Sequence, residues 1–576
     1  MSATGPGSAL QRWLTEPRYA SYQPQLRALL ERHPERLGDA FDGDLPFGTG
    51  GRRGLVGIGP NRINRATVAS SVAAHVVWLR RRLPSKDLSV CIGYDVRRFA
   101  DRGGVYLADV PNPVLGLTSR DLAIHAARAY AEAGVAVWLP SEGHLSTPEL
   151  SYAVRQLGAD GGLVISASHN PPDDNGLKVY GADGGQLVPP ADEALLQCVG
   201  VEFHVEASAE IRELPDEVRE GWCTSASELC EVPPISVHVS ALHGAGRVDA
   251  VLRRAGVRCT VDQPQSIPDG AFPTIPDGVA NPENPGVLLA AAERAGEADL
   301  VMGTDPDGDR IGCLVRHAGR WVPLSGQQIC VLVVDAALRH WNEDATPVVV
   351  ATHVTTRLVH RLAMKRRAKC LTDLPVGFKY IGEAMGRLAD PSVAFCIGVE
   401  ESHGVLSSTA LRDKDAAHGA MWLALSAGEA RGSGMTLVDR LVELYLTHGY
   451  LRCAALSARL ARTEDRAAVM TRLRAPRTPL TLAGFELRFV EDRLTRGPFG
   501  SSSMHAAHDV LTYWLRDDAT TDLESARVTF RPSGTEPKLK AYLEIMGAAG
   551  LSSDGRARID RRMGALRDAI SGLIDA

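Results

Sequence analysis

Three aspartates are crowded into one short loop, which reads Gly-Thr-Asp-Pro-Asp-Gly-Asp-Arg at residues 303–310. If Asp305, Asp307 and Asp309 converge to about 5 Å, each carboxylate pair repels by roughly 3 kcal/mol at an effective dielectric constant near 20. The loop must therefore spread into water or hold a cation. Its ligands are all oxygen atoms, which suit a hard ion such as Mg²⁺ shared with a phosphate oxygen. A solvated acidic turn is the simplest alternative.

A second loop can supply a nucleophile. Residues 164–176 read Val-Ile-Ser-Ala-Ser-His-Asn-Pro-Pro-Asp-Asp-Asn-Gly, so an apolar strand delivers two serines, and two prolines then prevent a helix. A serine hydroxyl is a poor nucleophile until a base is near it. His169 and Lys178 are close in sequence, and either can exchange the proton or offset phosphate charge. We expect one serine to carry phosphate; the alternative is a turn that hydrogen-bonds its own backbone.

Two further loops suit the binding of phosphate and sugar. Residues 44–54, Asp-Leu-Pro-Phe-Gly-Thr-Gly-Gly-Arg-Arg-Gly, match neither a P-loop nor a dinucleotide fingerprint, but their arginines can neutralise a transferring phosphoryl group. Residues 398–404, Gly-Val-Glu-Glu-Ser-His-Gly, offer two carboxylates, a hydroxyl and an imidazole to the hydroxyls of a sugar ring. A surface hairpin and an exposed charged turn are the respective alternatives.

A last polar loop predicts a phosphate cradle. It reads Arg-Pro-Ser-Gly-Thr-Glu-Pro-Lys-Leu-Lys at residues 531–540. Arg531, the hydroxyls of Ser533 and Thr535, and backbone N–H groups freed by Gly534 can together hold a phosphate dianion. The flanking prolines disfavour a helix, and a plain turn is the alternative.

A repeated helix–break–strand pattern positions the first of these loops. Thr147 is expected to cap a helix, and the strand 163–165 that follows carries the serines at its carboxyl end. Similar units place strands at 300–302 and 393–397 before the aspartates and before Glu400. Since ligands bind at the carboxyl ends of parallel strands, we expect three similar α/β domains with mainly parallel or mixed sheets around a central active-site cleft.

The last quarter of the chain reads strand, loop, strand and then a helix from about Arg556, which predicts a smaller C-terminal α+β domain. Segments 100–121 and 201–234 fit the pattern poorly and are interpreted as surface insertions. The expected domains are 1–225 with the serines, 226–325 with the aspartates, 326–450 with the sugar-binding loop, and 451–576 as a phosphate-binding lid.

Composition narrows the possible partners and location. A chain of 576 residues is too long for one core, and 63 basic against 69 acidic residues give a net charge of −6 without a basic block. Nucleic acid and anionic membranes are therefore not expected partners. The N-terminus lacks the apolar core of a signal peptide. Ten scattered cysteines without a C-x-x-C pair are typical of reduced thiols, so we expect a cytoplasmic protein.

Taken together, these loops resemble those of the α-D-phosphohexomutases, the superfamily of phosphoglucomutases and phosphomannomutases. The resemblance runs from about Gly48 to Tyr542, with the motifs in the family's order. Residues 240–246, Ser-Ala-Leu-His-Gly-Ala-Gly, and 376–382, Val-Gly-Phe-Lys-Tyr-Ile-Gly, also fit, whereas Asp-Lys-Asp-Ala at 413–416 replaces the usual Asp-Lys-Asp-Gly. The length of the chain and the residues in its motifs are similar to those of the phosphoglucomutase-2-like branch, which includes phosphopentomutases and bisphosphate synthases.

The resemblance implies a mechanism and a set of site residues. Ser168 would be the phosphoserine, share Mg²⁺ with Asp305, Asp307 and Asp309, and pass its phosphoryl group to a sugar monophosphate through a bisphosphate intermediate. A sugar 1,6-bisphosphate would then act as primer. Proton transfer and charge stabilisation would fall to Arg53, His169, Lys178, Arg310 and Lys379. Substrate binding would fall to Glu400, Ser402, His403, Arg531, Ser533, Gly534 and Thr535.

The resemblance therefore implies an isomerase that interconverts hexose 1-phosphate and hexose 6-phosphate, most simply of glucose. Phosphomannomutase, phosphopentomutase and sugar-bisphosphate synthase are alternatives. Two other classes stay open: a haloacid-dehalogenase-type phosphotransferase with Asp305 as nucleophile, and a non-catalytic sugar-phosphate sensor. The preferred sugar and the choice between monomer and homodimer also stay open.

Overall fold

The structure is a computed structural model that describes residues 6–47, 51–84, 86–201, 208–460, 465–476, 479–496, 508–517, 523–533 and 538–575. The chain forms two compact units. The first comprises Met1–Leu324, Met385–Arg387 and Gly404–Ala424, and the second comprises Ser325–Ala384, Leu388–His403 and Leu425–Ala576. None of the helices in the described part of the chain is both long enough and apolar enough to cross a bilayer.

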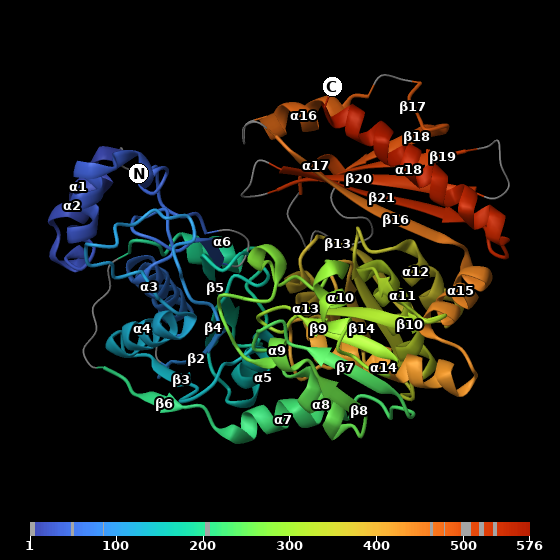
Figure 1. The fold of residues 1–576 in the computed structure, drawn as a ribbon, viewed down its shortest axis with the longest axis horizontal. Coiled ribbons are helices and arrows are strands. Elements are labelled where there is room, and N and C mark those ends of the chain that lie inside the picture. The colour runs from blue at the N-terminus through green and yellow to red at the C-terminus, as the bar shows by residue number, and fades with distance from the viewer. Residues whose placement is uncertain are drawn as a thin grey trace. The chain divides into compact units, whose positions relative to one another are not determined.

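A six-stranded sheet in the first unit carries the serine loop (Figure 1). Its order is β1-β5-β4-β2-β3-β6; β4, β2, β3 and β6 run parallel, and β5 is antiparallel to both of its neighbours. Helices α3 and α4 pack side by side. The strands are β1 (Gly51–Leu55), β2 (Ser89–Tyr94), β3 (Ala136–Leu139), β4 (Gly161–Ile165), β5 (Asp174–Gly181) and β6 (Ile211–Glu213). The helices are α1 (Pro6–Thr15), α2 (Gln23–Arg32), α3 (Arg65–Arg82), α4 (Ser119–Glu132), α5 (Thr147–Gln156) and α6 (Ala191–Leu196), with short 3₁₀ turns η1 (Pro17–Tyr19) and η2 (Pro34–Leu37).

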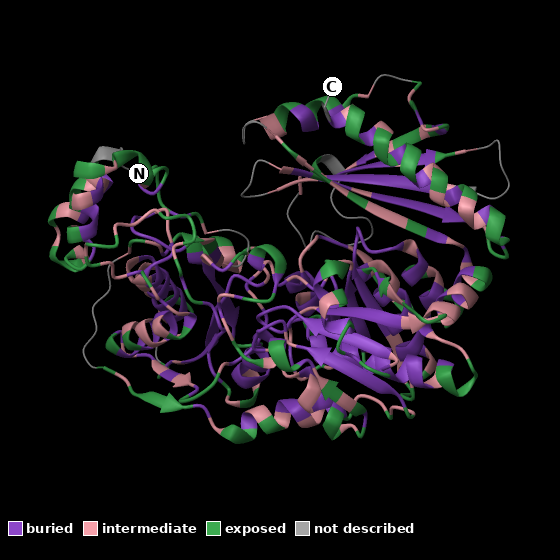
Figure 2. Ribbon diagram, viewed as in Figure 1, coloured by how far each residue is buried: buried purple, intermediate pink, exposed green. Residues whose placement is uncertain are grey.

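A five-stranded sheet in the same unit carries the aspartate loop. Its order is β11-β10-β9-β7-β8, with β7 parallel to β8 and β9, and with β10 antiparallel to β9 and β11. Every residue of β7 and β9 is buried (Figure 2). The strands are β7 (Ser236–Ser240), β8 (Arg258–Val261), β9 (Leu300–Thr304), β10 (Ile311–His317) and β11 (Arg320–Leu324). The helices are α7 (Asp216–Ser227), α8 (Val248–Arg254), α9 (Gln263–Ser266), η3 (Pro276–Gly278) and α10 (Pro285–Ala292).

The second unit contains a third sheet, in which β12 (Thr346–Thr352) lies between β13 (Lys369–Leu374) and β14 (Val393–Glu400) and is parallel to both. Its helices are α11 (Gly326–Arg339), α12 (Arg357–Lys365), α13 (Phe378–Gly386) and α15 (Leu437–His448). Two elements lie between β14 and α15 along the chain: β15 (Gly404–Leu406) and α14 (Ala416–Gly432).

The C-terminal sheet is antiparallel throughout, in the order β16-β21-β20-β19-β18-β17. Helix α18 packs against β16 and β21 through a stripe of Ile559, Met563, Leu566 and Ile570, whose spacing places them on one helical face. The strands are β16 (Leu451–Arg459), β17 (Thr481–Leu482), β18 (Phe485–Asp492), β19 (Leu511–Arg516), β20 (Leu523–Pro532) and β21 (Lys538–Gly547). The helices are α16 (Asp465–Arg474), α17 (Arg493–Arg496) and α18 (Ser553–Asp575).

The predicted fold class is confirmed: three α/β sheets of mixed or parallel type precede a C-terminal α+β sheet. The predicted strands lie within β4, β9 and β14. The domain boundaries at 225, 325 and 450 stay predictions. The expected cap at Thr147 is wrong, because Ser146 is the N-cap and Thr147 is the first helical residue. The carboxylate of Glu149 accepts hydrogen bonds from both the N–H and the hydroxyl of Ser146.

The interpretation of segments 100–121 and 201–234 as surface insertions stays a prediction: their described residues are mostly exposed or partly exposed, but each segment also has buried residues. In the first segment Val114 and Leu117 are buried, and the backbone N–H of Arg102 donates to Asp173 in the serine loop at 2.7 Å. In the second segment Trp222 on α7 is 2% exposed, and its indole N–H donates to Asp415 at 2.8 Å. Both segments therefore support loops that carry polar chemistry.

Candidate active site

The serine loop and the aspartate loop meet in the first unit. Ser168 Oγ donates a hydrogen bond of 2.8 Å to Asp305 Oδ2. Strand β4 ends at Ile165 and β9 ends at Thr304, so both loops leave the carboxyl end of a buried strand. Ser168 is 2% exposed and Asp305 is fully buried. The serine expected to carry phosphate therefore contacts the loop expected to bind the metal.

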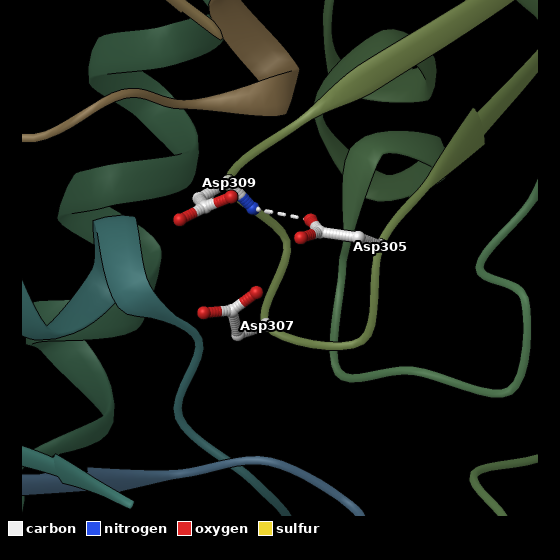
Figure 3. Close-up of side chains that lie close together, drawn as sticks. All are labelled: Asp305, Asp307 and Asp309. Atoms are coloured by element: carbon white, nitrogen blue, oxygen red, sulfur yellow. Dashed lines mark hydrogen bonds between the residues drawn. The ribbon is translucent and has the colours of Figure 1, made fainter. Parts of the chain in front are cut away.

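The three aspartates converge (Figure 3): each of Asp305, Asp307 and Asp309 offers a carboxylate oxygen within 4.8 Å of the others. The N–H groups of Asp309 and Arg310 donate to Asp305 Oδ1 at 3.1 and 3.0 Å, which folds the loop onto itself. Gly308 has a φ of +71°, a left-handed conformation that glycine adopts without strain. The acidic groups are buried and do not spread into water.

Three basic side chains compensate the buried acidic charge. Lys178 Nζ lies 2.7 Å from Asp307 Oδ2 and 3.3 Å from Asp309 Oδ2. Lys414 Nζ lies 2.9 Å from Asp309 Oδ2, and Arg310 Nε lies 3.8 Å from Asp309 Oδ1. Lys178 and Arg310 were predicted site residues, whereas Lys414 was not. Its Asp-Lys-Asp-Ala setting was the sequence signal that could have indicated it.

Burial and the neighbouring charges separate the pKa values of the three carboxyl groups. Burial raises the pKa of Asp305 well above its ordinary value, and the other two aspartates raise it further. Burial acts on Asp307 too, but Lys178 and hydrogen bonds outweigh it and lower the pKa of Asp307 below its ordinary value. The two lysines likewise outweigh burial at Asp309 and lower its pKa. Asp307 and Asp309 are therefore the ionised members of the cluster.

The aspartates also fit a divalent metal ion. Both lysines engage Oδ2 atoms, and the Oδ1 atoms of Asp307 and Asp309 are buried without a hydrogen-bond partner in the described part of the chain. A buried carboxylate oxygen without a donor is unfavourable, and an all-oxygen ligand set is typical of hard cations. Asp305, Asp307 and Asp309 would hold the ion.

Two predicted basic groups contact the serine loop. His169 Nδ1 is 3.3 Å from Ser168 Oγ. Burial, followed by the charges of Arg310 and Arg53, lowers the pKa of His169 well below its ordinary value, so its imidazole is neutral. Arg53 on β1 is exposed and donates to Asn170 Oδ1 at 3.4 Å.

Thr147 belongs to the same cluster, although the sequence had indicated only a helix cap. Its N–H donates to the carbonyl oxygen of Asp307 at 2.9 Å, and its hydroxyl donates to Asp307 Oδ2 at 3.0 Å. Lys178 Nζ lies 3.4 Å from the same hydroxyl. The first turn of α5 therefore fixes the middle of the aspartate loop.

In the second unit, the predicted sugar-binding loop leaves the carboxyl end of β14. Glu400 is the last residue of that strand and is 5% exposed. Ser402 is partly exposed, and His403 is buried with a left-handed φ of +65°. Thr352, at the end of β12, donates its hydroxyl to Glu401 Oε2 at 3.2 Å. The loop is thus built into the unit and is no exposed charged turn.

Lys379 and Arg531 lie in this unit as well. Lys379 is in the first turn of α13, is 6% exposed, and has its Nζ 5.2 Å from the centroid of the Tyr380 ring. Burial lowers the pKa of His508, and Arg493, Arg531 and Lys379 lower it further. All three cations are therefore within electrostatic reach of His508, and Arg493 is also paired with Glu491 at 3.3 Å. Sequence analysis had singled out neither Arg493 nor His508.

Tyr542 interacts electrostatically with both the predicted phosphate-binding loop, through Arg531, and the sugar-binding loop, through Glu400 and Glu401. Burial raises the pKa of Tyr542, and Glu401 and Glu400 raise it further. Arg531 acts on the same hydroxyl and lowers its pKa. Arg531 and the two glutamates are therefore within electrostatic reach of one phenol, as expected of groups that bind one ligand.

Part of the phosphate loop can be described. Ser533 is partly buried, and its N–H donates to the carbonyl oxygen of Lys538, the first residue of β21, at 2.8 Å. Gly534 and Thr535, and residues 48–50 of the glycine-rich loop, lie outside the described residues.

Comparison with known proteins gives a consistent result. The chain matches the domain models of phosphoglucomutase/phosphomannomutase: alpha/beta/alpha domain I at residues 117–203, domain II at 221–319 and domain III at 325–445. A phosphoglucomutase of Staphylococcus saprophyticus is 28% identical over 538 residues, which cover 89% of this chain and 92% of that protein. A phosphoglucomutase of Staphylococcus aureus is 29% identical over 540 residues, which cover 88% and 90% respectively.

Solved structures show the same fold. A phosphoglucomutase/phosphomannomutase family protein from Burkholderia thailandensis superposes with a TM-score of 0.64 at 17% identity, over 92% of this chain and 97% of that one. The open form of parafusin, a phosphoglucomutase from Paramecium, gives a TM-score of 0.62 at 15% identity, over 92% and 95%.

Fold and site together define an isomerase of the phosphosugar mutase class, which acts by phosphoryl transfer. This class is metal-dependent, and the three aspartates are suited to a metal ion. The chain belongs to the phosphoglucomutase/phosphomannomutase family. This membership favours the serine carrier over an acyl phosphate on Asp305, and it favours an enzyme over a sugar-phosphate sensor.

Proposed function

We propose that the protein interconverts glucose 1-phosphate and glucose 6-phosphate through a phosphoserine at Ser168 and a glucose 1,6-bisphosphate intermediate. The observation that carries the proposal is the 2.8 Å hydrogen bond from Ser168 Oγ to Asp305 Oδ2 inside a buried acidic cluster. A serine that transfers phosphate needs positive charge near its hydroxyl, which Lys178, Arg310 and a metal ion held by the aspartates would supply. The phosphoglucomutases among the relatives support glucose as the sugar.

The roles of the residues follow from their contacts. Ser168 Oγ attacks the phosphorus of the bisphosphate and gives up its hydroxyl proton. The bond between phosphorus and the sugar oxygen breaks, and that oxygen takes up a proton, so the step releases one proton and consumes one. Two groups can take the hydroxyl proton when Ser168 is the nucleophile: Asp305 Oδ2, which accepts it at 2.8 Å, and His169, whose Nδ1 lies 3.3 Å from Ser168 Oγ. Lys178 and Arg310 offset the charge of the aspartates and of the phosphoryl group.

We assign the metal to Mg²⁺, held by Asp305, Asp307 and Asp309 together with the phosphoserine. When bound, the ion supplies positive charge to the phosphoryl oxygens. A titration with Mg²⁺, followed by the melting temperature, tests this assignment. Mg²⁺ should raise the melting temperature of the wild-type protein, and Asp309→Asn should remove most of that increase. Equal shifts in both proteins would contradict the assignment.

Recognition of the sugar falls to the second unit. Glu400, Ser402 and His403 would read the ring hydroxyls. Lys379, Arg531, Ser533, Gly534 and Thr535 would hold the phosphate that is not reacting. The bisphosphate would act as primer, because an unphosphorylated Ser168 must first be charged. Mannose phosphate and pentose phosphate are the alternative substrates. The synthesis of sugar bisphosphates, as in the phosphoglucomutase-2-like branch, is the alternative activity.

Location and assembly are further proposals. We infer a cytoplasmic enzyme, which is supported by ten cysteines that are all free thiols. Its partner would be a small phosphosugar, with no role for nucleic acid or membrane, because the net charge is −6. Monomer and homodimer are both compatible with the chain as described.

Substitution of Ser168 tests the proposed function. Ser168→Ala should lower mutase activity on glucose 1-phosphate by at least about 1,000-fold, since the nucleophile is lost. Peptide mass analysis of the wild-type protein should find one phosphate on the peptide that contains Ser168. Ser141→Ala, at an exposed serine of the same unit, is the matched control and should retain full activity. Full activity in Ser168→Ala would refute the mechanism.

The choice of sugar has its own test. Values of kcat/KM should be compared for glucose, mannose and ribose 1-phosphates, with the corresponding bisphosphate supplied. Glucose should give the highest value; a higher value for ribose 1-phosphate would reassign the protein as a phosphopentomutase.

A further inference from the structure

Arg97, three residues after the end of β2, is 1% exposed and uses every one of its guanidinium N–H groups. Four of them bind backbone carbonyl oxygens within residues 168–174, and the fifth binds a carboxylate. The acceptors are Ser168 O and Asn170 O (2.6 Å) for Nη2, Pro171 O (2.6 Å) and Asp174 O (3.1 Å) for Nη1, and Asp95 Oδ2 (3.1 Å) for Nε.

Asp95 extends this contact to the other side of Ser168. It accepts hydrogen bonds from the hydroxyl of Ser166 at 2.7 Å and from the hydroxyl of Ser119 at 2.5 Å. Ser166 Oγ in turn accepts the N–H of Ser168 at 2.8 Å. Both backbone polar groups of Ser168 are therefore tied to the Arg97–Asp95 pair, its carbonyl directly and its N–H through one serine.

The conformation held in this way is unusual. Ser168 has a φ of +51°, in the left-handed region that residues with a Cβ atom rarely adopt. Such a residue keeps this conformation only where its surroundings fix it. In this conformation its Oγ reaches Asp305 Oδ2 at 2.8 Å.

We propose that Arg97 is a positioning residue for phosphoryl transfer: it holds Ser168 in the left-handed conformation that directs Oγ at the aspartate cluster. The proposal rests on the proposed function, since it assigns Arg97 a role in the same reaction. Arginine is required because four carbonyl oxygens and one carboxylate need five donors in a planar fork. Lysine offers three donors from a single nitrogen and leaves at least two of these oxygens without one.

Kinetics of the full-length protein provide the first test. Arg97→Lys keeps the charge but not the fork, so kcat should fall about 100-fold, as expected when a reacting atom is displaced by about 1 Å. KM should change less than about threefold, because the proposed sugar and phosphate contacts lie elsewhere. Asp95→Asn should act in the same direction. Arg98→Lys, at the adjacent and exposed arginine, is the matched control and should match the wild type.

Hydrogen exchange gives a readout that needs no substrate. Arg97→Lys should increase deuterium uptake in peptides that cover residues 166–176 and leave peptides of β7 unchanged. Loss of kcat with increased exchange in this loop, at an unchanged folded fraction, supports the proposal. Unchanged exchange in the loop, or a loss of activity that only follows the folded fraction, overturns it. If the wild-type protein proves inactive on sugar phosphates, the proposed function fails, and the exchange result still decides whether Arg97 holds the loop.

Discussion

At the scale of single residues, the buried acidic cluster is shaped as much by lysines as by aspartates. Lys178 and Lys414 engage the Oδ2 atoms of Asp307 and Asp309, and this keeps both carboxyl groups ionised despite their burial. Each lysine thus prepares oxygens for a metal ion while occupying none of the Oδ1 atoms.

Lys414→Met tests this arrangement. Asp309 loses its 2.9 Å partner, so its pKa should rise and it should become protonated at a higher pH than in the wild type. We expect at least a roughly tenfold loss of kcat/KM near pH 6 that partly recovers towards pH 8. Lys365→Met, at an exposed lysine, is the control in the same pH series. A pH profile that keeps the wild-type shape would contradict this role of Lys414.

At the scale of elements, helix α7 supports the segment that carries Lys414. Trp222 on α7 donates its indole N–H to Asp415 Oδ2 at 2.8 Å, and the N–H of Ala417 donates to Asp415 Oδ1 at 2.8 Å. Burial raises the pKa of Asp415 to about 7. The native state therefore retains a proton that the unfolded chain releases near pH 4, so the stability contributed by this group falls as pH rises towards 7.

Trp222→Phe should show that dependence. The substitution removes the hydrogen-bond donor but keeps an aromatic ring. The lost hydrogen bond lowers the free energy of unfolding most when Asp415 is ionised. We expect a destabilisation of about 1–3 kcal/mol at pH 8 and a smaller one at pH 5, measured by denaturant unfolding at both pH values. Trp138→Phe on β3 should show no such change between the two pH values. A penalty that is larger at pH 5 would mean that the neutral acid uses the indole donor.

Gly244 explains how the motif at residues 240–246, which follows β7, packs against the aspartate loop. A Cβ atom on Gly244 would lie 2.5 Å from the Cα atom of Pro306, so the loop backbone can approach only a glycine. The N–H of Ala245 donates to the carbonyl oxygen of Pro306 at 2.8 Å across this close contact.

Gly244→Ala should therefore displace the aspartate loop. We expect a protein of lower melting temperature in which Mg²⁺ binds at least about tenfold more weakly by titration, because the metal ligands move with the loop backbone. Gly103→Ala is the control, since a Cβ atom there would have only an ordinary contact with Val105 at 3.7 Å. Wild-type affinity for Mg²⁺ in Gly244→Ala would show that the loop adjusts without moving its carboxylates.

At the scale of the whole molecule, the sequence predicted the chemistry of single loops better than the contacts between loops. Asp305, Asp307 and Asp309 lie within five consecutive residues, so their type and spacing alone indicated a cation site. The bond between Trp222 and Asp415 joins residues 193 positions apart, and no local pattern of either one predicts it. Arg97 was missed for the same reason, because its acceptors are carbonyl oxygens, which every residue has.

The residues that we propose for phosphoryl transfer belong to the first unit, and most of those that we propose for ligand binding belong to the second. Arg531→Ala tests this division. Loss of a charged donor to phosphate should raise KM for glucose 1-phosphate about 10- to 100-fold, the equivalent of about 1.5–3 kcal/mol. Phosphate on Ser168 should persist in this variant, because Ser168 and its neighbours belong to the other unit. Arg459→Ala, at an exposed arginine on β16, should leave both quantities unchanged. If Arg531→Ala lowered kcat at unchanged KM, the arginine would act on the reacting phosphoryl group, and the separation of transfer from recognition would be wrong.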